Sequence, residues 1–505
     1  MMDLNQLPVL SIVIFLPMLI AIGQFWLNEN QARFASLLTT TLLMILSIGI
    51  YLQFNTQVPD MQFQEHYQWF KFLPVTYHLG LDGISLSMLL LTSVTHFLLS
   101  LTSWHLIKEK AHQYLAIFLI IQGITNGVFL ALDGFLFYCF WEALLIPMYL
   151  GIGIFGGQDR AYAAKKFFLY TFAASIFLLA GMIYLAHITG SYDLTQWLDA
   201  PISVIAQRWL FWAFLLAFAI KIPIFPFHTW LPDAHTQAPT GGSIILAALM
   251  LKVGGYGLYR FLLPMFPDAC AYFANIMIIK ALVSIIYISI ITLKQQDMKR
   301  LIAYSSVAHM GFVTLGCFMI YHLPHDRSQF EIAKMALEGG LFQMIAHGMG
   351  SGGLFLGYGL IYNRIHTRSI DQMRGMLTLM PILSGLFICF ALSNVGLPST
   401  AGFVGEFLVI VASMKAHSII AILAATSLIL GASYTLWMVK RVFFGVPLPD
   451  HQGIMKLQTM EIIALSGFVI MVFALGIYPE IVLDTMHTNI NALAKLAIST
   501  NIPIH

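Results

Sequence analysis

The chain has 505 residues, of which 59% are hydrophobic and only 10% are charged, and its formal net charge is +2. Its mean hydropathy is +0.82. A soluble globule of this size would need far more polar surface, so the composition excludes that class and predicts an integral membrane protein. We expect contacts with membrane lipid and no nucleic-acid partner.

Apolar segments recur along nearly the whole chain. Because a helix needs roughly 20 residues to cross about 30 Å of hydrocarbon, segments of this length favour helices over a β-barrel. We therefore predict an all-α membrane protein with about 14 transmembrane helices. The predicted helix centres lie near Phe15, Leu43, Leu90, Ile120, Leu145, Phe177, Ala217, Ala248, Ile286, Phe312, Leu354, Ala401, Leu428 and Val472.

The basic residues are concentrated in alternate loops, such as those at 294–300 and 364–374. Short loops rich in lysine and arginine tend to stay in the cytoplasm. With an even number of helices, this bias predicts a multi-pass protein of the bacterial inner membrane with both termini on the non-cytoplasmic side. The first apolar stretch follows Asp3 rather than a basic segment, which favours a retained helix over a removable signal peptide.

The chain shows no low-complexity linker and no shift of composition, so we expect one polytopic domain over residues 1–505. Within it we distinguish N-terminal helices at 1–110, a first repeat at 112–262, a second repeat at 271–441, and a C-terminal helix and tail at 442–505.

Two of the predicted helices contain helix-breaking residues. Lys221 is followed by Pro223 and Pro226, and Glu406 follows a run that contains Pro398. Proline removes a backbone donor and clashes with the preceding turn, so each helix is expected to split in two. The breaks lie five helices apart in the predicted order, and an odd spacing reverses the direction through the membrane. We interpret this as two inverted five-helix repeats, each containing a broken helix, an arrangement in which such helices mark a transport site.

Four ionisable residues lie inside apolar runs, namely Glu142, Lys221, Lys252 and Glu406. Charges at membrane depth are costly and usually functional, so these residues indicate a path for charge across the bilayer. Desolvation favours a neutral lysine and a nearby carboxylate favours the charged form, so a Glu142–Lys221 pair could act as a switch for a proton. The alternative is a static buried ion pair that locks two helices together.

Lys252 is followed by Gly254, Gly255 and Gly257, which allow a backbone or water to approach closely, and we place this lysine in the middle of the path. A lysine that extends to the nearer interface is the alternative for Lys252, and it is our interpretation of Lys280.

Four histidines, His228, His235, His309 and His347, are possible proton relays, because an unperturbed pKa of about 6.5 makes both forms accessible. Each could equally be a histidine that only forms hydrogen bonds between helices. The group His228, Asp233 and His235 crosses a turn with proline, which disfavours a metal site, and we predict none. The four cysteines are far apart in the sequence, so no iron–sulfur ligand set is expected in this chain.

Four motifs are specific enough to compare with known families. They are Leu79-Gly-Leu-Asp-Gly-Ile-Ser85, Phe140-Trp-Glu-Ala-Leu-Leu-Ile-Pro147, the block from Lys221 to Pro239 with Pro226-Phe-His-Thr-Trp-Leu-Pro-Asp-Ala-His235, and Asp297-Met-Lys-Arg-Leu-Ile-Ala-Tyr-Ser-Ser306. These motifs resemble the antiporter-like membrane subunits of respiratory complex I (NADH:quinone oxidoreductase), in particular the chain M and mitochondrial chain 4 family. Glu406 favours this family over its sister chains, which usually have lysine at that point.

The resemblance implies fourteen helices with inverted repeats and a place in the membrane arm between sister antiporter-like subunits. It also implies proton pumping driven by NADH oxidation and quinone reduction in other subunits, which would carry the flavin, iron–sulfur clusters and quinone. Glu142 and Lys221 would be the coupling pair, Lys252 the central lysine and Glu406 the exit acid. His309 and His347 would be polar residues along the path.

Two other functions remain open from the sequence. The chain could belong to a multi-chain cation/proton antiporter or a membrane-bound hydrogenase, which share these motifs. It could also be a scaffold that joins membrane subunits without conducting protons, with its buried charges static.

Overall fold

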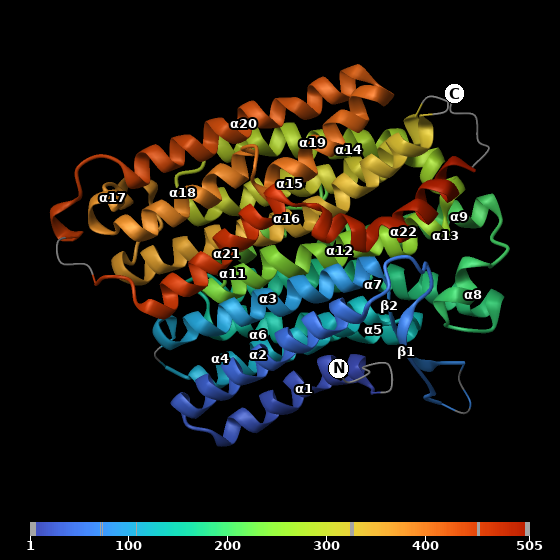
Figure 1. Ribbon diagram of the computed structural model, residues 1–505, viewed down its shortest axis with the longest axis horizontal. Coiled ribbons are helices and arrows are strands. Elements are labelled where there is room, and N and C mark those ends of the chain that lie inside the picture. The colour runs from blue at the N-terminus through green and yellow to red at the C-terminus, as the bar shows by residue number, and fades with distance from the viewer. Residues whose placement is uncertain are drawn as a thin grey trace.

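The computed structural model describes residues 7–70, 72, 74–107, 109–323, 328–451 and 455–499. Most of these residues are helical, and the long helices run side by side in one array (Figure 1). Every one of the predicted helix centres lies within a helix, so the helical class is confirmed.

The first part of the described chain contains α1 (Val9–Gly23), α2 (Glu29–Gln53), α3 (Gly83–Leu106) and α4 (Ala111–Leu130), with a 3-10 turn at Gln24–Trp26. The start of α2 is set by a capping box, in which the side chains of Asn28 and Gln31 each accept a hydrogen bond from the other residue's backbone N–H.

The next part contains the first break. α9 ends at Lys221 and α10 begins only at Trp230, as the two prolines between them predicted. The helices are α5 (Gly134–Ala143), α6 (Leu145–Phe155), α7 (Arg160–Thr189), α8 (Leu194–Leu198), α9 (Val204–Lys221) and α10 (Trp230–Gln237).

A continuous helical span, Thr240–Met265, holds Lys252 at the centre of the protein. It consists of α11 (Thr240–Ile245), α12 (Leu251–Gly257) and α13 (Leu263–Met265), joined by the π-helical turns η3 (Leu246–Met250) and η4 (Leu258–Leu262). All residues from 241 to 263 are buried, so other helices surround this span.

The remaining helices contain the second break, where α18 ends at Val395 and α19 begins at Ala401. Between them Gly396 has φ +79°, a conformation that favours glycine. The helices are α14 (Pro267–Leu293), α15 (Met298–Met319), α16 (Gln329–Ile365), α17 (Met376–Leu379), α18 (Pro381–Val395), α19 (Ala401–Ala416), α20 (Ser418–Phe443), α21 (Thr459–Ile477) and α22 (Glu480–Ile498), with short 3-10 turns at Ile320–His322, Ile370–Met373 and Pro449–His451.

In the described part of the chain, 12 helices are long and apolar enough to cross a membrane, or up to 13 when a bent pair counts as one span. This establishes a multi-pass membrane protein. The helix α22 was not indicated by the sequence pattern, which gave only one helix and a tail for this end of the chain.

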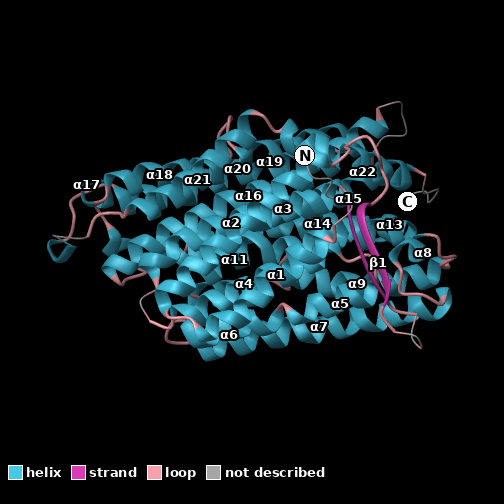
Figure 2. Cartoon of the chain, turned by 60° about the horizontal axis from the view of Figure 1, so that its bottom comes forward, coloured by secondary structure: helices cyan, strands magenta, loops and turns pink. Residues whose placement is uncertain are grey.

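A two-stranded antiparallel hairpin, β1 (Gln62–Gln68) and β2 (Thr76–Leu81), adds to the expected all-α fold. It lies at one end of the helix array, the end that also holds α8, while α17 lies at the other (Figure 2). An isolated bridge between Leu79 and Ala131 ties β2 to the segment that leads into α5.

A buried ion pair joins the start of α3 to the central span. Arg260 Nη2 lies 2.5 Å from Asp82 Oδ1, and the two side chains are only 9% and 2% exposed. Arg260 also donates hydrogen bonds to the hydroxyl groups of Tyr256 (2.9 Å) and Ser85 (3.1 Å). The same Asp82 oxygen accepts from the backbone N–H of Ser85 and so caps α3.

Because the pair is buried, we expect Arg260→Met to lower the free energy of unfolding by about 3–5 kcal/mol, since it leaves the Asp82 carboxylate buried without its partner. The effect is measured as a lower midpoint of thermal unfolding of the purified protein in detergent. Asp82→Asn in the same chain should recover part of the loss. The exposed Arg374→Met serves as the control and should change stability by no more than about 0.5 kcal/mol; an equal effect of both arginine variants would contradict the prediction.

Candidate functional site

Lys221 lies at the C-terminal end of α9, and its side chain is buried. Its Nζ lies 3.5 Å from the centre of the Trp141 ring and donates a hydrogen bond of 3.2 Å to the backbone oxygen of Trp141. A cation over the face of tryptophan is attracted by the ring quadrupole. The lysine is therefore held against α5 by an aromatic ring and a carbonyl group.

Glu142 is the neighbour of Trp141 in α5, is partly buried, and lies beside the side chain of Ser175. Glu142 and Lys221 interact electrostatically, but the ion pairs of the described residues do not include one between them. The predicted pair is thus present as two neighbouring groups that are not in direct contact.

Lys252 is fully buried in α12, between the two π-helical turns. Its Nζ donates to the backbone oxygen of Ala247 at 2.5 Å and lies 2.6 Å from Nδ1 of His347 in α16. Gly254 permits the close approach of α9 that its position predicted, because a Cβ there would lie 2.8 Å from the backbone nitrogen of Ile222. π-Helical turns are frequent at functional sites.

A line of polar side chains continues from His347 toward the second broken helix. The rings of His347 and His309 have their centres 5.7 Å apart. His309 in α15 then places Nδ1 2.5 Å from Oε1 of Glu406 in α19. Gln343 donates a further hydrogen bond of 3.0 Å to the same oxygen. The structure therefore brings together four of the predicted site residues, Lys252, His347, His309 and Glu406.

Hydrogen bonds hold the His309 ring on both of its nitrogens. Asn394 donates through Nδ2 to the hydroxyl of Thr435 at 2.9 Å, and its Oδ1 faces Nε2 of His309 at 3.0 Å. The other ring nitrogen faces Glu406. His309 and Glu406 are therefore fixed against each other at hydrogen-bonding distance.

The two remaining histidines are in different surroundings. His235 is fully buried and stacked on Phe355, with ring centres 4.7 Å apart, and neither of its ring nitrogens has a hydrogen-bond partner among the described residues. His235 interacts electrostatically with Lys252 and His347, so it extends the central group. His228 stacks on Phe225 away from this group.

Asp233 does not join His228 and His235. Its carboxylate pairs with Lys166 at 2.7 Å and with Arg300 at 3.6 Å. Lys280 is partly buried, with Nζ 5.6 Å from the centre of the Phe227 ring, and has no contact with the central group among the interactions of the described residues.

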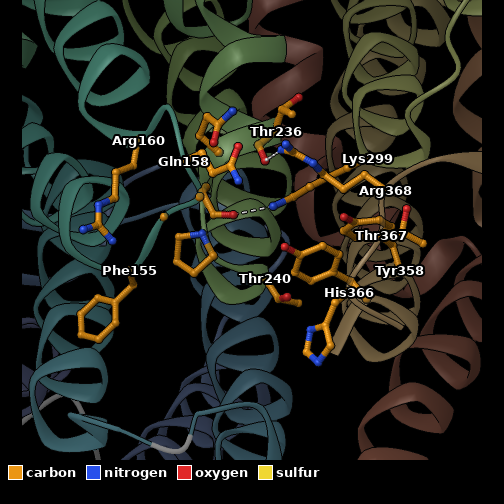
Figure 3. Close-up of a pocket in the computed structure, with 16 residues that line it drawn as sticks. Phe155, Gln158, Arg160, Thr236, Thr240, Lys299, Tyr358, His366, Thr367 and Arg368 are labelled. Atoms are coloured by element: carbon orange, nitrogen blue, oxygen red, sulfur yellow. Dashed lines mark hydrogen bonds between the residues drawn. The ribbon is translucent and has the colours of Figure 1, made fainter. Parts of the chain in front are cut away.

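A polar cavity of about 680 Å³ opens at the end of the array opposite the hairpin. Figure 3 shows Lys299, from the first turn of α15, pointing across the cavity, where its Nζ donates a hydrogen bond to the backbone oxygen of Ala238. Lys299 is only 5% exposed and interacts electrostatically with His235. The lining includes Gln158, Arg160, Thr236, Gln237, Thr240, Lys299, Tyr358, His366 and Arg368.

Lys299 was not among the residues that the sequence singled out. It stands in the motif Asp297-Met-Lys-Arg300, beside a loop rich in basic residues, and so resembled an ordinary interfacial charge. The only signal in the sequence was its position at the start of an apolar helix. The cavity itself is formed by segments that are distant in the chain.

Comparison with known proteins gives consistent relatives. Residues 131–431 match the family described as NADH:quinone oxidoreductase/Mrp antiporter, TM. The chain is 40% identical to NADH-quinone oxidoreductase subunit M of Rickettsia prowazekii over 497 residues, which cover 97% of this chain and 99% of that protein. It is 37% identical to NADH-ubiquinone oxidoreductase chain 4 of Marchantia polymorpha, over 96% of this chain and 97% of that protein.

Solved structures show the same fold. A chain of respiratory complex I from Thermus thermophilus with bound NADH has a TM-score of 0.87 at 30% identity, covering 97% of this chain and 99% of that one. A chain of the Mrp complex from a Dietzia species has a TM-score of 0.84 at 19% identity, covering 99% of this chain and 100% of that one, a likeness of fold alone.

Proposed function

Because the chain belongs to the NADH:quinone oxidoreductase/Mrp antiporter family of membrane subunits, we propose that it is the proton-translocating subunit M of the membrane arm of a respiratory NADH:quinone oxidoreductase. It assembles with other membrane-arm subunits, including sister antiporter-like chains. NADH oxidation and quinone reduction take place in other subunits, and flavin, iron–sulfur clusters and quinone belong to those subunits rather than to this chain.

The sequence identity to subunits of respiratory NADH:quinone oxidoreductase is higher than the identity to a subunit of an Mrp complex, which favours this assignment over an antiporter subunit. The chain is 40% identical to subunit M of Rickettsia prowazekii over almost its full length, whereas the matching chain of the Mrp complex is only 19% identical.

The observation that carries the proposal is the continuous line from Lys252 through His347 and His309 to Glu406. A proton on Nζ of Lys252 is within direct transfer distance of Nδ1 of His347, at 2.6 Å. Nε2 of His347 is buried without a hydrogen-bond partner among the described residues, which leaves it available to a water molecule between the two imidazoles. For His309 to pass this proton on, its Nε2 exchanges the hydrogen bond to Asn394 for one to the water and takes the proton there, while its Nδ1 gives a proton to Glu406 across their 2.5 Å contact.

Protons reach Lys252 from the polar cavity beside the first turn of α15. Lys299 forms the buried end of that cavity, and His235 interacts electrostatically with both lysines. The ring nitrogens of His235, which have no hydrogen-bond partner among the residues that the structure describes, allow it to accept a proton on one side and release one on the other. The cavity thus serves as the inlet, and Glu406, beside the break before α19, serves as the outlet.

Glu142 and Lys221 act as the coupling pair. In the arrangement described, Lys221 rests on Trp141 and is not paired with Glu142. Movement of Glu142 toward Lys221 would stabilise the ammonium group, and movement away would favour release of its proton. The end of α9 at Lys221 provides the local freedom for this change.

We place the protein in the bacterial inner membrane with fourteen spans. The count adds α16 and the broken pair α18 and α19 to the 12 apolar helices. The breaks after α9 and α18 are then the matching parts of two inverted five-helix repeats. The cavity lies on the side of the basic loops, so it faces the cytoplasm, and both termini lie on the opposite side with the hairpin.

The test is proton translocation by the complex with Glu406→Gln, reconstituted in vesicles. Glutamine keeps the shape of the side chain and can still form hydrogen bonds, but it cannot receive a proton from His309. We expect the number of protons moved per NADH oxidised to fall, while quinone reduction measured with an uncoupler is retained. Proton translocation is measured as the change of pH inside the vesicles.

The exposed Glu331 in α16 offers a control, since Glu331→Gln removes a carboxylate far from the line. The control should pump normally. Undiminished pumping by Glu406→Gln would support a scaffold with static charges instead.

A further inference from the structure

Two histidines face each other across the hairpin, at the end of the protein opposite the inlet. His66 on β1 and His78 on β2 are partners in the strand register, and their ring centres lie 4.6 Å apart. Residues directly opposite in an antiparallel pair project from the same face. His66 is exposed and His78 is 7% exposed, so the pair lies between solvent and the interior.

A carboxylate from a distant segment completes the group. Asp193, in the connection between α7 and α8, places Oδ2 2.7 Å from Nδ1 of His78. Its other oxygen accepts hydrogen bonds from the backbone N–H and the hydroxyl of Thr195, at 2.9 and 2.5 Å, and so caps α8. The carboxylate is therefore fixed in position by its own helix.

The group contains a second oxygen donor beside the carboxylate. Nε2 of His78 also lies 3.2 Å from the side-chain oxygen of Gln64, which adds another oxygen at the edge of the group.

From this geometry we propose that His66, His78 and Asp193 bind a divalent transition-metal ion of the zinc class. One ligand atom from each residue lies within 4.8 Å of the others. Two imidazoles and a carboxylate are a ligand set that zinc uses, with metal–ligand distances of about 2.0–2.2 Å. Imidazole ligands favour zinc over magnesium or calcium.

The metal would tie the hairpin to the connection between α7 and α8. The Asp193 part of the site rests on fixed supports, because Trp197 donates through Nε1 to the backbone oxygen of Ser191 at 2.7 Å, and an isolated bridge joins Asp133 to Asp193. Rigid support of the ligands favours binding at a defined geometry. The inference concerns residues outside the proton path and does not depend on the proposed pumping role.

The experiment compares zinc binding by intact complexes that contain the wild-type chain, His66→Gln or His78→Gln. Each preparation is first treated with a chelator and then dialysed against radioactive Zn²⁺. We expect each wild-type complex to bind one zinc ion at this site. Each variant should bind this ion at least about tenfold more weakly, because even the loss of an outer-shell partner weakens metal binding by that factor. The exposed His187, at the end of α7 on the same side, gives the control His187→Gln, which should bind as the wild type does.

Equal zinc binding by the wild type and both ligand variants overturns the proposal. A second measurement needs no variant and applies if His78→Gln does not assemble. Zinc should protect the exposed His66 of the wild type from modification by diethylpyrocarbonate, read by mass spectrometry, and leave His187 reactive. Equal modification of His66 with and without zinc also overturns the proposal.

Discussion

Complexes that contain Lys252→Met are expected to lose proton movement through this chain by about 100-fold or more, the contribution typical of a positioned proton donor and acceptor. Methionine is unbranched and adapts to its surroundings, so the buried span should keep its packing. The substitution removes the 2.6 Å contact with His347 and so separates the inlet from the line to Glu406. The effect is measured as the fall in protons moved into vesicles per NADH oxidised, and the expected fall is this chain's share of the total, because the sister antiporter-like chains continue to contribute.

Lys415 provides a matched control for this variant. It is exposed near the end of α19 and has no part in the buried line, so Lys415→Met should pump as the wild type does. A Lys252→Met complex that reduces quinone and pumps with the wild-type yield would show that protons take another route.

Lys221→Arg distinguishes a proton carrier from a structural cation. Arginine keeps the positive charge and also stacks on aromatic rings, so it can retain the contact with Trp141. It does not release its proton in proteins. We therefore expect the variant to assemble with normal thermal stability and to lose proton movement through this chain by about 100-fold or more.

The opposite result is equally informative. If the role of Lys221 is only to hold α9 against α5, the arginine variant keeps pumping and Lys221→Met lowers stability by loss of the cation–π contact. Both variants are examined for the midpoint of thermal unfolding and for proton yield, so an effect on folding is separated from an effect on transport.

Several members of the buried polar line could be predicted from the sequence because ionisable residues within apolar runs are rare and costly. This physical cost singled out Lys221, Lys252 and Glu406, and the prolines after Lys221 placed the first break correctly. The glycines after Lys252 predicted a close backbone approach, which the contact of Gly254 with α9 confirms.

Contacts between distant segments could not be predicted in the same way. Nothing in the sequence shows that the ring of Trp141 contacts the ammonium group of Lys221. The same is true of the hairpin, whose strands are short and polar, and of Asp193, which reaches His78 only when the α7–α8 connection folds against it. Lys299 was overlooked because an interfacial lysine and a buried one look alike when they start a helix.

The helix that holds Lys252 is enclosed by protein over its whole middle, from residue 241 to 263. Lipid chains therefore do not contact the middle of this helix, and the surrounding side chains set its position along the membrane normal. A change in bilayer thickness should tilt or stretch the outer helices such as α2 and α20 first. The depth of Lys252, and with it the spacing of the contacts from Lys252 to Glu406, is therefore independent of the lipid composition of the membrane.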